Sequence, residues 1–319
     1  MACSRAMADA PQRPRVVLDC DPGHDDVLAL IVAARHAELV AITTVAGNAP
    51  LALTTRNAIV VRDLLGLDVA VHSGAERPLI APPRSAGFVH GESGLDGTSL
   101  PEPSGPPASD DAVGAIVDAC RQEEGLWLVP TGPLTNIALA LRAAPDLGRR
   151  IAGISLMGGG TFGNRTAVAE FNIWADPEAA AIVFGYGGPL KMTGLDLTYR
   201  FQATPARIAS VRSTPGRLAS AVADLLTFYS RAYLGQHDDV QGAAMHDPCA
   251  VLALTHPELF TSEPRRVEVE TGGEHTRGMT VIDHRPRSDR GEPNCELMTT
   301  IDDAAAFEVL LGAIAHFSR

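Results

Sequence analysis

The chain has 319 residues, of which 45% are hydrophobic and 20% are charged, a composition typical of a globular protein with a sizeable core. Its formal net charge of -12 leaves no basic surplus to neutralise phosphates, which argues against a nucleic-acid-binding protein. The five cysteines are scattered and form no CxxC pair. We therefore expect reduced thiols in a cytoplasmic protein and no disulfide or zinc framework.

Residues 1–14 are small and polar and contain no apolar run of signal-peptide length, so we expect a disordered N-terminal tail. No apolar run approaches the roughly 20 residues that a membrane-spanning helix needs, and we expect no membrane partner. Residues 15–319 contain no Ser/Gly-rich linker and no repeat, which indicates a single domain.

Short apolar, β-branched runs alternate with helical patterns through the first two thirds of this domain. The predicted strands span residues 15–20, 39–45, 69–72, 126–129, 151–157 and 190–193. The predicted helices span residues 25–36, 51–65, 110–124, 134–143 and 177–184. This alternation predicts an α/β fold with a mainly parallel, open, Rossmann-like sheet and helices on both faces.

The last third has a different pattern. Helices are predicted over residues 204–213, 216–234, 247–255 and 302–317, which gives a helical C-terminal region. Three further segments are candidate late strands that an antiparallel arrangement would suit, namely residues 267–270, 279–283 and 297–301. Residues 73–109 form a long loop dense in Gly and Pro that contains His90. An active-site flap and a surface loop without function are both open for it.

Four aspartates lie within eight residues directly behind the apolar run at residues 16–18 of the first predicted strand: Asp19, Asp21, Asp25 and Asp26. Their mutual repulsion would destabilise a buried turn unless a cation were bound there. Carboxylates suit Ca²⁺ or Mg²⁺, and no thiolate or imidazole cluster lies nearby. An acidic helix N-cap is the alternative, but one or two aspartates are enough for a cap, so the four together favour a metal site.

Polar side chains follow several predicted strands. Asn48 follows the second strand, Thr131 follows residues 126–129, and Asn164, Glu170 and Asn172 follow the strand that ends at residue 157. Ligands bind beyond the carboxyl ends of the strands in an open parallel sheet. We therefore expect these side chains to share one ligand site.

A glycine motif follows the strand at residues 151–157. Gly158, Gly160 and Gly163 match the GxGxxG pattern of dinucleotide-binding proteins. The next predicted helix begins only near Pro177, so a pyrophosphate would lack the helix N-terminus on which it binds. The sequence therefore argues against nicotinamide or flavin binding, and the glycines suit a close approach of the backbone to a ligand.

A late acidic site consists of His246 and Asp247, directly before Pro248. Asp247 has the typical position of a helix N-cap, and a structural role for His246 is equally open. A histidine beside an aspartate also suits a proton donor next to a metal ligand.

Together these segments resemble the nucleoside hydrolases of the inosine-uridine-preferring family, from about Arg15 to the C-terminus. The resemblance rests on an ordered set of motifs at residues 19–26, 41–48, 129–137, 157–160, 170–172 and 246–249. It implies Ca²⁺-dependent hydrolysis of the N-glycosidic bond of ribonucleosides to ribose and free base. It also implies a homodimer or homotetramer.

The resemblance implies roles for single residues. Asp21, Asp26 and Asp247 look like side-chain calcium ligands, and Thr131 offers its carbonyl oxygen. Asp21 also matches the acceptor of the water proton, and His246 matches the acid that protonates the leaving base. Substrate contacts are implied for Asp25, Asn48, His90, Met157, Asn164, Glu170, Phe171, Asn172 and Asp247.

Base preference stays open at this level. Tyr229, Tyr233 and His237 lie near the family's base contacts, but the spacing between Phe228 and His246 departs from the family pattern. Purine and pyrimidine nucleosides are both retained.

Two other functions are alternatives. An acidic-motif phosphohydrolase would use Asp19 and Asp21, but the motifs contain no Lys or Arg for a phosphate. A catalytically silent, calcium-dependent ribose- or nucleoside-binding protein would keep the pocket, but it would not need Asp21 and His246 together.

Overall fold

The computed structural model describes residues 13–234, 240–286 and 291–319. The expected N-terminal tail therefore falls almost wholly outside the described residues. His237, one of the expected base contacts, also lies outside them. No helix in the described ranges is long and apolar enough to cross a membrane.

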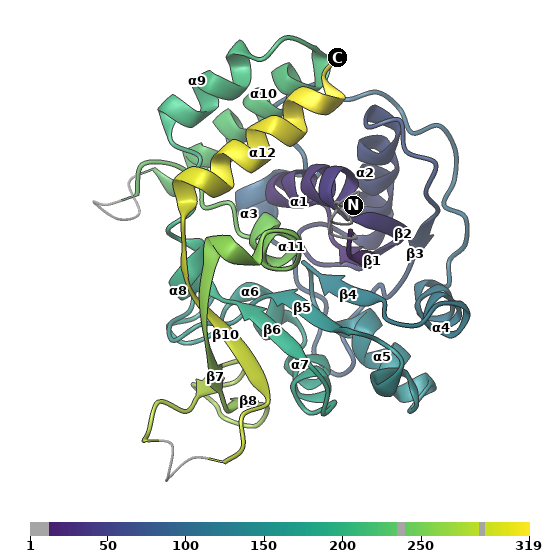
Figure 1. The fold of residues 1–319 in the computed structure, drawn as a ribbon, viewed down its shortest axis with the longest axis vertical. Coiled ribbons are helices and arrows are strands. Elements are labelled where there is room, and N and C mark those ends of the chain that lie inside the picture. Colours follow the sequence, from purple (N-terminus) through teal and green to yellow (C-terminus); the bar gives the residue numbers. More distant parts are fainter. Residues whose placement is uncertain (1–12, 235–239, 287–290) are drawn as a thin grey trace, which may run out of the picture.

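A mainly parallel sheet forms the centre of the fold, as predicted (Figure 1). Its order among the described residues is β3-β2-β1-β4-β5-β6-β10-β7. Every neighbouring pair is parallel except β10 and β7. The strands of this sheet are β1 (Arg15–Cys20), β2 (Glu38–Thr44), β3 (Val71–Ser73), β4 (Trp127–Pro130), β5 (Gly153–Met157), β6 (Leu190–Thr193), β7 (Phe260–Arg265) and β10 (Cys295–Ile301).

Helices cover both faces of the sheet (Figure 1). One layer packs on the side chains of Val16 and Leu18, and the other packs on Val17, because successive side chains of a strand point to opposite faces. The first layer contains α1 (His24–His36), α2 (Leu51–Leu64), α10 (Arg217–Tyr233), α11 (Pro248–Thr255) and α12 (Asp303–Phe317). The second layer contains α4 (Ala112–Gln122), α5 (Thr135–Ala143) and α7 (Pro177–Phe184).

The remaining elements are short, apart from α9. They are α3 (Gly87–His90), α6 (Phe171–Ala175), α8 (Leu195–Thr198), α9 (Pro205–Ser213), η1 (Leu147–Arg149) and η2 (Pro257–Leu259). β8 (Val267–Val269) and β9 (Thr280–Ile282) form a separate antiparallel pair. A helix of four or five residues shows no 3.6-residue period, which explains why α3, α6 and α8 were not predicted.

The expected antiparallel arrangement of the late strands is confirmed. β8 pairs antiparallel with β9, and residues 297–301 belong to β10, which pairs antiparallel with β7. β10 also pairs in parallel with β6, at Glu296 and Leu297. β7 was missed altogether. It is an edge strand whose residues 261–264 are exposed, and it contains Pro264, which is tolerated there because edge strands need fewer backbone donors. Its sequence therefore lacks the alternation of a half-buried strand.

The strand order places a binding crevice at the carboxyl end of β1. β2 pairs with β1 along one edge of that strand, whereas β4 pairs with β1 along its other edge. Ligands bind at such a reversal point in open α/β sheets. Asp19 pairs with Thr43 of β2 and with Pro130 of β4, so the aspartate-rich turn, the loop before α2 and the Thr131 loop leave the sheet side by side.

Candidate active site

A pocket of about 110 Å³ lies at this edge of the sheet. All nine expected substrate contacts line it, namely Asp25, Asn48, His90, Met157, Asn164, Glu170, Phe171, Asn172 and Asp247. Thr131, Tyr229, Tyr233 and His246 line it as well. Asp21 and Asp26 are fully buried and do not reach the pocket surface. The fold thus brings together residues that are up to 222 positions apart, from Asp25 to Asp247.

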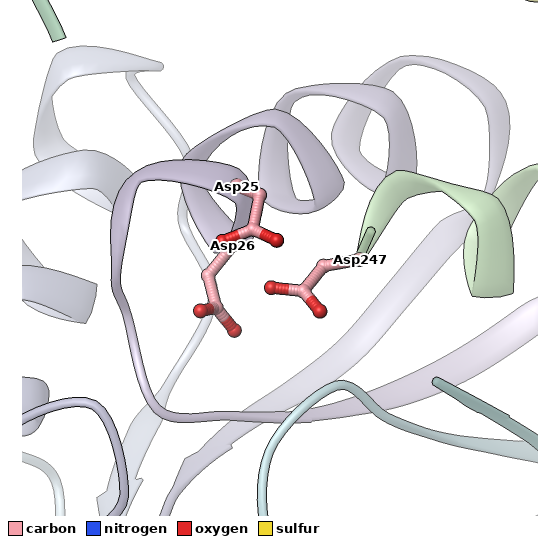
Figure 2. Close-up of side chains that lie close together, drawn as sticks. All are labelled: Asp25, Asp26 and Asp247. Atoms are coloured by element: carbon pink, nitrogen blue, oxygen red, sulfur yellow. The ribbon is translucent and has the colours of Figure 1, made fainter. Parts of the chain in front are cut away.

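Three carboxylates converge beside the pocket (Figure 2). Asp25 and Asp26 belong to the first turn of α1, and Asp247 directly precedes α11. Oxygen atoms of the three side chains all lie within 4.8 Å of one another. Asp247 occupies the N-cap position of α11, but its side chain makes no capping hydrogen bond. Its carboxylate instead points to the other two, as a metal site requires.

Asp26 ties three segments together. Its Oδ2 accepts hydrogen bonds from the backbone N–H of Gly23 at 3.0 Å and from the side chain of Asn48 at 3.2 Å. Its Oδ1 accepts one from the Thr131 hydroxyl at 2.8 Å. The N-cap of α1 is Gly23 and Asp26 is at position N3, where its side chain accepts the Gly23 backbone N–H. Asp26 therefore has a capping contact in the first turn, but it is not the N-cap itself.

Asp21 lies between two loops that approach it closely. Its Oδ2 accepts a hydrogen bond from the backbone N–H of Asn48 at 2.6 Å. A Cβ atom on Gly47 would lie 2.0 Å from Oδ2, and one on Gly132 would lie 2.5 Å from Oδ1. Only glycine leaves room for the carboxylate at these two positions. Oδ1 is buried and has no hydrogen-bond partner among the described residues.

Burial makes these carboxyl groups costly to ionise. Burial and the neighbouring Asp26 charge raise the pKa of Asp25 to about 7. Burial, followed by the charges of neighbouring aspartates, raises the pKa of Asp21 and that of Asp247 well above the ordinary range. None of the salt bridges found in the described ranges involves these groups. A buried, unpaired carboxylate group with an unpartnered oxygen fits a hard divalent cation.

The loop after β5 is shaped by the polar residues that were expected to bind hydroxyl groups. Asn172 donates to the carbonyl oxygen of Thr131 at 2.8 Å and to that of Met157 at 3.1 Å. Glu170 accepts backbone N–H bonds from Gly159, Asn172 and Ile173. No helix starts in this loop before Phe171, so the GxGxxG motif lacks the helix that a dinucleotide site needs.

His246 lies beside the carboxylate cluster, since its backbone N–H donates to Asp25 Oδ2 at 3.3 Å, and its ring lies between two hydroxyl groups. The Thr198 hydroxyl lies 2.7 Å from Nδ1, and the Tyr233 hydroxyl lies 3.0 Å from Nε2. The Tyr229 hydroxyl lies 3.2 Å from that of Tyr233, which extends the chain of hydrogen bonds. Burial lowers the pKa of His246 to about 4, so the ring is neutral at pH 7.

Four pocket residues were not predicted from the sequence, namely Ala86, Val89, Arg165 and Tyr199. Tyr199 follows α8, which begins directly after β6. Extending the strand-end rule to β6 would have found it. Arg165 adjoins Asn164, but an arginine in a loop carries no signal of its own. Within the long loop, Ala86, Val89 and His90 line the pocket, which supports a functional segment there.

Comparison with known proteins identifies the family of the chain. The model of the family described as inosine-uridine preferring nucleoside hydrolase matches residues 16–308. The chain belongs to this family. Because members of this family are hydrolases, the chain is an enzyme. The two alternatives, a phosphohydrolase and a catalytically silent binding protein, are therefore not retained.

Relatives of this nucleoside hydrolase cover nearly its whole length. It is 44% identical over 308 residues to the pyrimidine-specific ribonucleoside hydrolase RihA of Enterobacter sp. (strain 638), covering 95% of this chain and 98% of that protein. It is 43% identical over 309 residues to RihA of Shewanella woodyi, covering 95% and 99%. The solved structure of a purine-preferring ribonucleoside hydrolase from Gardnerella vaginalis superposes with a TM-score of 0.89 at 32% identity, covering 95% of this chain and 99% of that one.

Proposed function

We propose that this nucleoside hydrolase cleaves pyrimidine ribonucleosides to ribose and free base, with Ca²⁺ bound at the carboxylate cluster. One observation carries the proposal: a buried carboxylate cluster and a hydrogen-bonded histidine lie beside the same pocket, joined by a hydrogen bond from the His246 backbone N–H to Asp25. The cluster suits the ribose side of the glycosidic bond, and the histidine suits the leaving base.

The proposed calcium ligands are the side chains of Asp21, Asp26 and Asp247 and the carbonyl oxygen of Thr131. Asp25 lies within reach of the same ion, because its carboxylate belongs to the cluster. Oxygen donors of this kind are the ligands that Ca²⁺ prefers. When bound, the ion would hold a water molecule and lower its pKa.

Asp21 is the proposed acceptor of the water proton. Burial, more than any other factor, raises the pKa of its carboxyl group, which makes it a stronger base than an exposed aspartate. The backbone N–H of Asn48 holds one oxygen in place. The other oxygen has no partner in the part of the chain that the structure describes, so it remains available for the proton.

The polar residues of the pocket are proposed to bind the ribose. Cleavage of a ribosyl bond passes through a cationic, oxocarbenium-like sugar, which nearby carboxylates stabilise. We assign the 2′- and 3′-hydroxyls to Asp25, Asn172 and Asp247, and the 5′-hydroxyl to Asn164 and Glu170. Asn48, His90, Met157 and Phe171 complete the proposed substrate contacts.

His246 is the proposed donor to the leaving base. Its ring is neutral at pH 7, because burial lowers its pKa to about 4, so it acts through a neutral N–H group. Each ring nitrogen already lies within hydrogen-bonding distance of a hydroxyl, on Thr198 or on Tyr233. A hydrogen bond from this N–H group would stabilise the departing base, and the hydroxyl at the other ring nitrogen would hold the tautomer.

The preference for pyrimidines is proposed from the RihA relatives, which are named pyrimidine-specific. A pyrimidine carries a carbonyl oxygen next to the glycosidic nitrogen. The phenol groups of Tyr229 and Tyr233, which line the pocket beside His246, suit a hydrogen bond to that acceptor. His237 is proposed as a third base contact.

Release of ribose from uridine, cytidine, inosine and adenosine tests the proposal, with each substrate assayed in Ca²⁺ and again in chelator. We expect faster turnover of uridine and cytidine, complete loss in chelator, and recovery on adding Ca²⁺. Equal or faster turnover of inosine would overturn the pyrimidine preference. Turnover that survives chelation would overturn the cation site.

We further propose that residues 15–319 form one domain and that the enzyme is a cytoplasmic homodimer or homotetramer. The four cysteines within the described residues are buried and unpaired, in keeping with a reducing compartment. Light scattering during gel filtration tests the assembly, and fractionation of the source cells tests the location.

A further inference from the structure

His24 belongs to the turn that carries the carboxylate cluster, yet its ring faces a different part of the molecule. The residue is 1% exposed. Its Nε2 lies 2.8 Å from the carbonyl oxygen of Asp96, 72 positions along the chain. A carbonyl oxygen only accepts, so a hydrogen bond here is donated by His24. This contact fastens the far end of the segment that contains α3 to the start of α1.

His24 also makes two contacts to one atom of His90. Its backbone N–H donates to His90 Nδ1 at 3.2 Å, and its side-chain Nδ1 lies 3.0 Å from the same nitrogen. The His24 imidazole therefore contacts the α3 segment at two points, the Asp96 carbonyl and the His90 ring.

The His24 ring is fixed from a third direction by α10. It lies nearly parallel to the rings of Tyr229 and Phe228, with centroids 5.1 and 5.4 Å away and interplanar angles of 3° and 8°. Tyr229 also contacts His90, at 5.1 Å between ring centroids. One buried ring thus connects the aspartate-rich turn, the α3 segment and a wall of the pocket.

We propose that His24 is a positioning residue that holds the His90 ring in place, so that Nε2 of His90 can form a hydrogen bond with the nucleoside. Within the described residues, Nε2 of His90 makes no hydrogen bond, whereas Nδ1 is occupied by His24. The inference rests on the proposed substrate contact of His90. It assigns a function to His24, which binds neither the proposed cation nor the substrate.

Two variants of His24 separate positioning from packing. His24→Phe keeps a flat ring beside Tyr229 but removes both side-chain hydrogen bonds. We expect its KM for uridine to rise about five- to tenfold, the effect of one hydrogen bond, with kcat within about twofold of wild type. His24→Gln, whose amide can donate to the Asp96 carbonyl, should recover most of the KM. An unchanged KM in His24→Phe would overturn the proposal.

His72→Phe is the matched control. His72 is half-buried and holds the other end of the same long loop through a 2.8 Å contact with the Ser109 hydroxyl, but it does not line the pocket. Its KM should equal that of wild type. A rise equal to that of His24→Phe would show that any loosening of the loop has the same effect, and would overturn a specific role for His24.

A double-mutant cycle completes the test. In a His90→Ala background, His24→Phe should cause no further rise in KM, since its effect passes through His90. An additive rise would overturn the inference. A normal KM in His90→Ala alone would overturn the substrate contact itself, which distinguishes failure of the proposed function from failure of this inference.

Discussion

The phenol oxygen of Tyr233 lies 3.0 Å from Nε2 of His246, although the two residues belong to different elements and are 13 positions apart. The other ring nitrogen of His246 faces the Thr198 hydroxyl at 2.7 Å. Both nitrogens are thereby supplied with exchangeable protons inside a buried wall. The arrangement suits a neutral histidine that donates a hydrogen bond to a leaving base while a hydroxyl at its other ring nitrogen holds the tautomer.

His246→Gln should lower kcat for uridine by about 10²- to 10⁴-fold, the usual contribution of a positioned acid. Tyr233→Phe should lower it about tenfold, since one hydrogen-bond partner is lost. Neither change should matter for a nitrophenyl riboside, whose leaving group departs without a proton. Steady-state rates on the two substrates check this, and equal losses on both would contradict a role for His246 in leaving-group protonation.

Asp247→Asn should weaken cation binding and lower activity by at least about 100-fold at a fixed Ca²⁺ concentration, because it removes one of three converging charges. Calorimetric titration with Ca²⁺ and ribose-release assays measure the two effects. Asp118→Asn, a change of the same chemistry at an exposed position of α4, is the control and should alter neither. Wild-type Ca²⁺ affinity in Asp247→Asn would exclude its carboxylate as a ligand.

The cation-free protein should lose stability as the pH rises. Burial raises the pKa of Asp19 and of Asp25 to about 7, against about 3.9 in an unfolded chain. Between these values the folded state binds protons that the unfolded state does not, so the free energy of unfolding decreases with rising pH. In chelator we expect Tm to fall by on the order of 5 °C between pH 5 and pH 8.

Added Ca²⁺ should oppose this loss, raising Tm more at pH 8 than at pH 5, because the cation competes with protons for the carboxylates. Calorimetric scans with and without chelator measure both effects. In Asp25→Asn the fall in Tm with pH should be smaller, since one titrating group is gone. A chelated wild-type protein whose Tm rises over this range would contradict the raised pKa values.

Gly47→Ala should displace Asp21, since the new Cβ would lie 2.0 Å from its Oδ2. The expected cost is about 1–3 kcal/mol of stability, typical of overpacking, together with weaker Ca²⁺ binding. Gly105→Ala is the control, because a Cβ there meets nothing within 4 Å. Urea unfolding and Ca²⁺ titration of both variants decide the matter. Equal behaviour of the two would show that the Gly47 loop yields without disturbing Asp21.

Much of the site could be predicted because its residues follow strand ends. Asn48, Thr131 and Asn172 were found by the rule that parallel strands deliver their following loops to one edge, and all three line the pocket. Tyr199 escaped because the rule was not extended to β6. The partners of single atoms, such as the two hydroxyls at His246, have no pattern in the sequence, since they come from three separate elements.

The sequence by itself determined the parallel sheet, its helical layers and the charge of the first turn, because periodic burial and local capping are written into neighbouring residues. Only the tertiary structure decided that β10 lies between β6 and β7, that His24 meets His90 across 66 positions, and that the His246 backbone donates to Asp25 across 221. Such contacts depend on how the helical layers pack on the sheet. The residues that separate two partners along the chain do not indicate that packing. The cluster of Asp25, Asp26 and Asp247 therefore needed the fold to form.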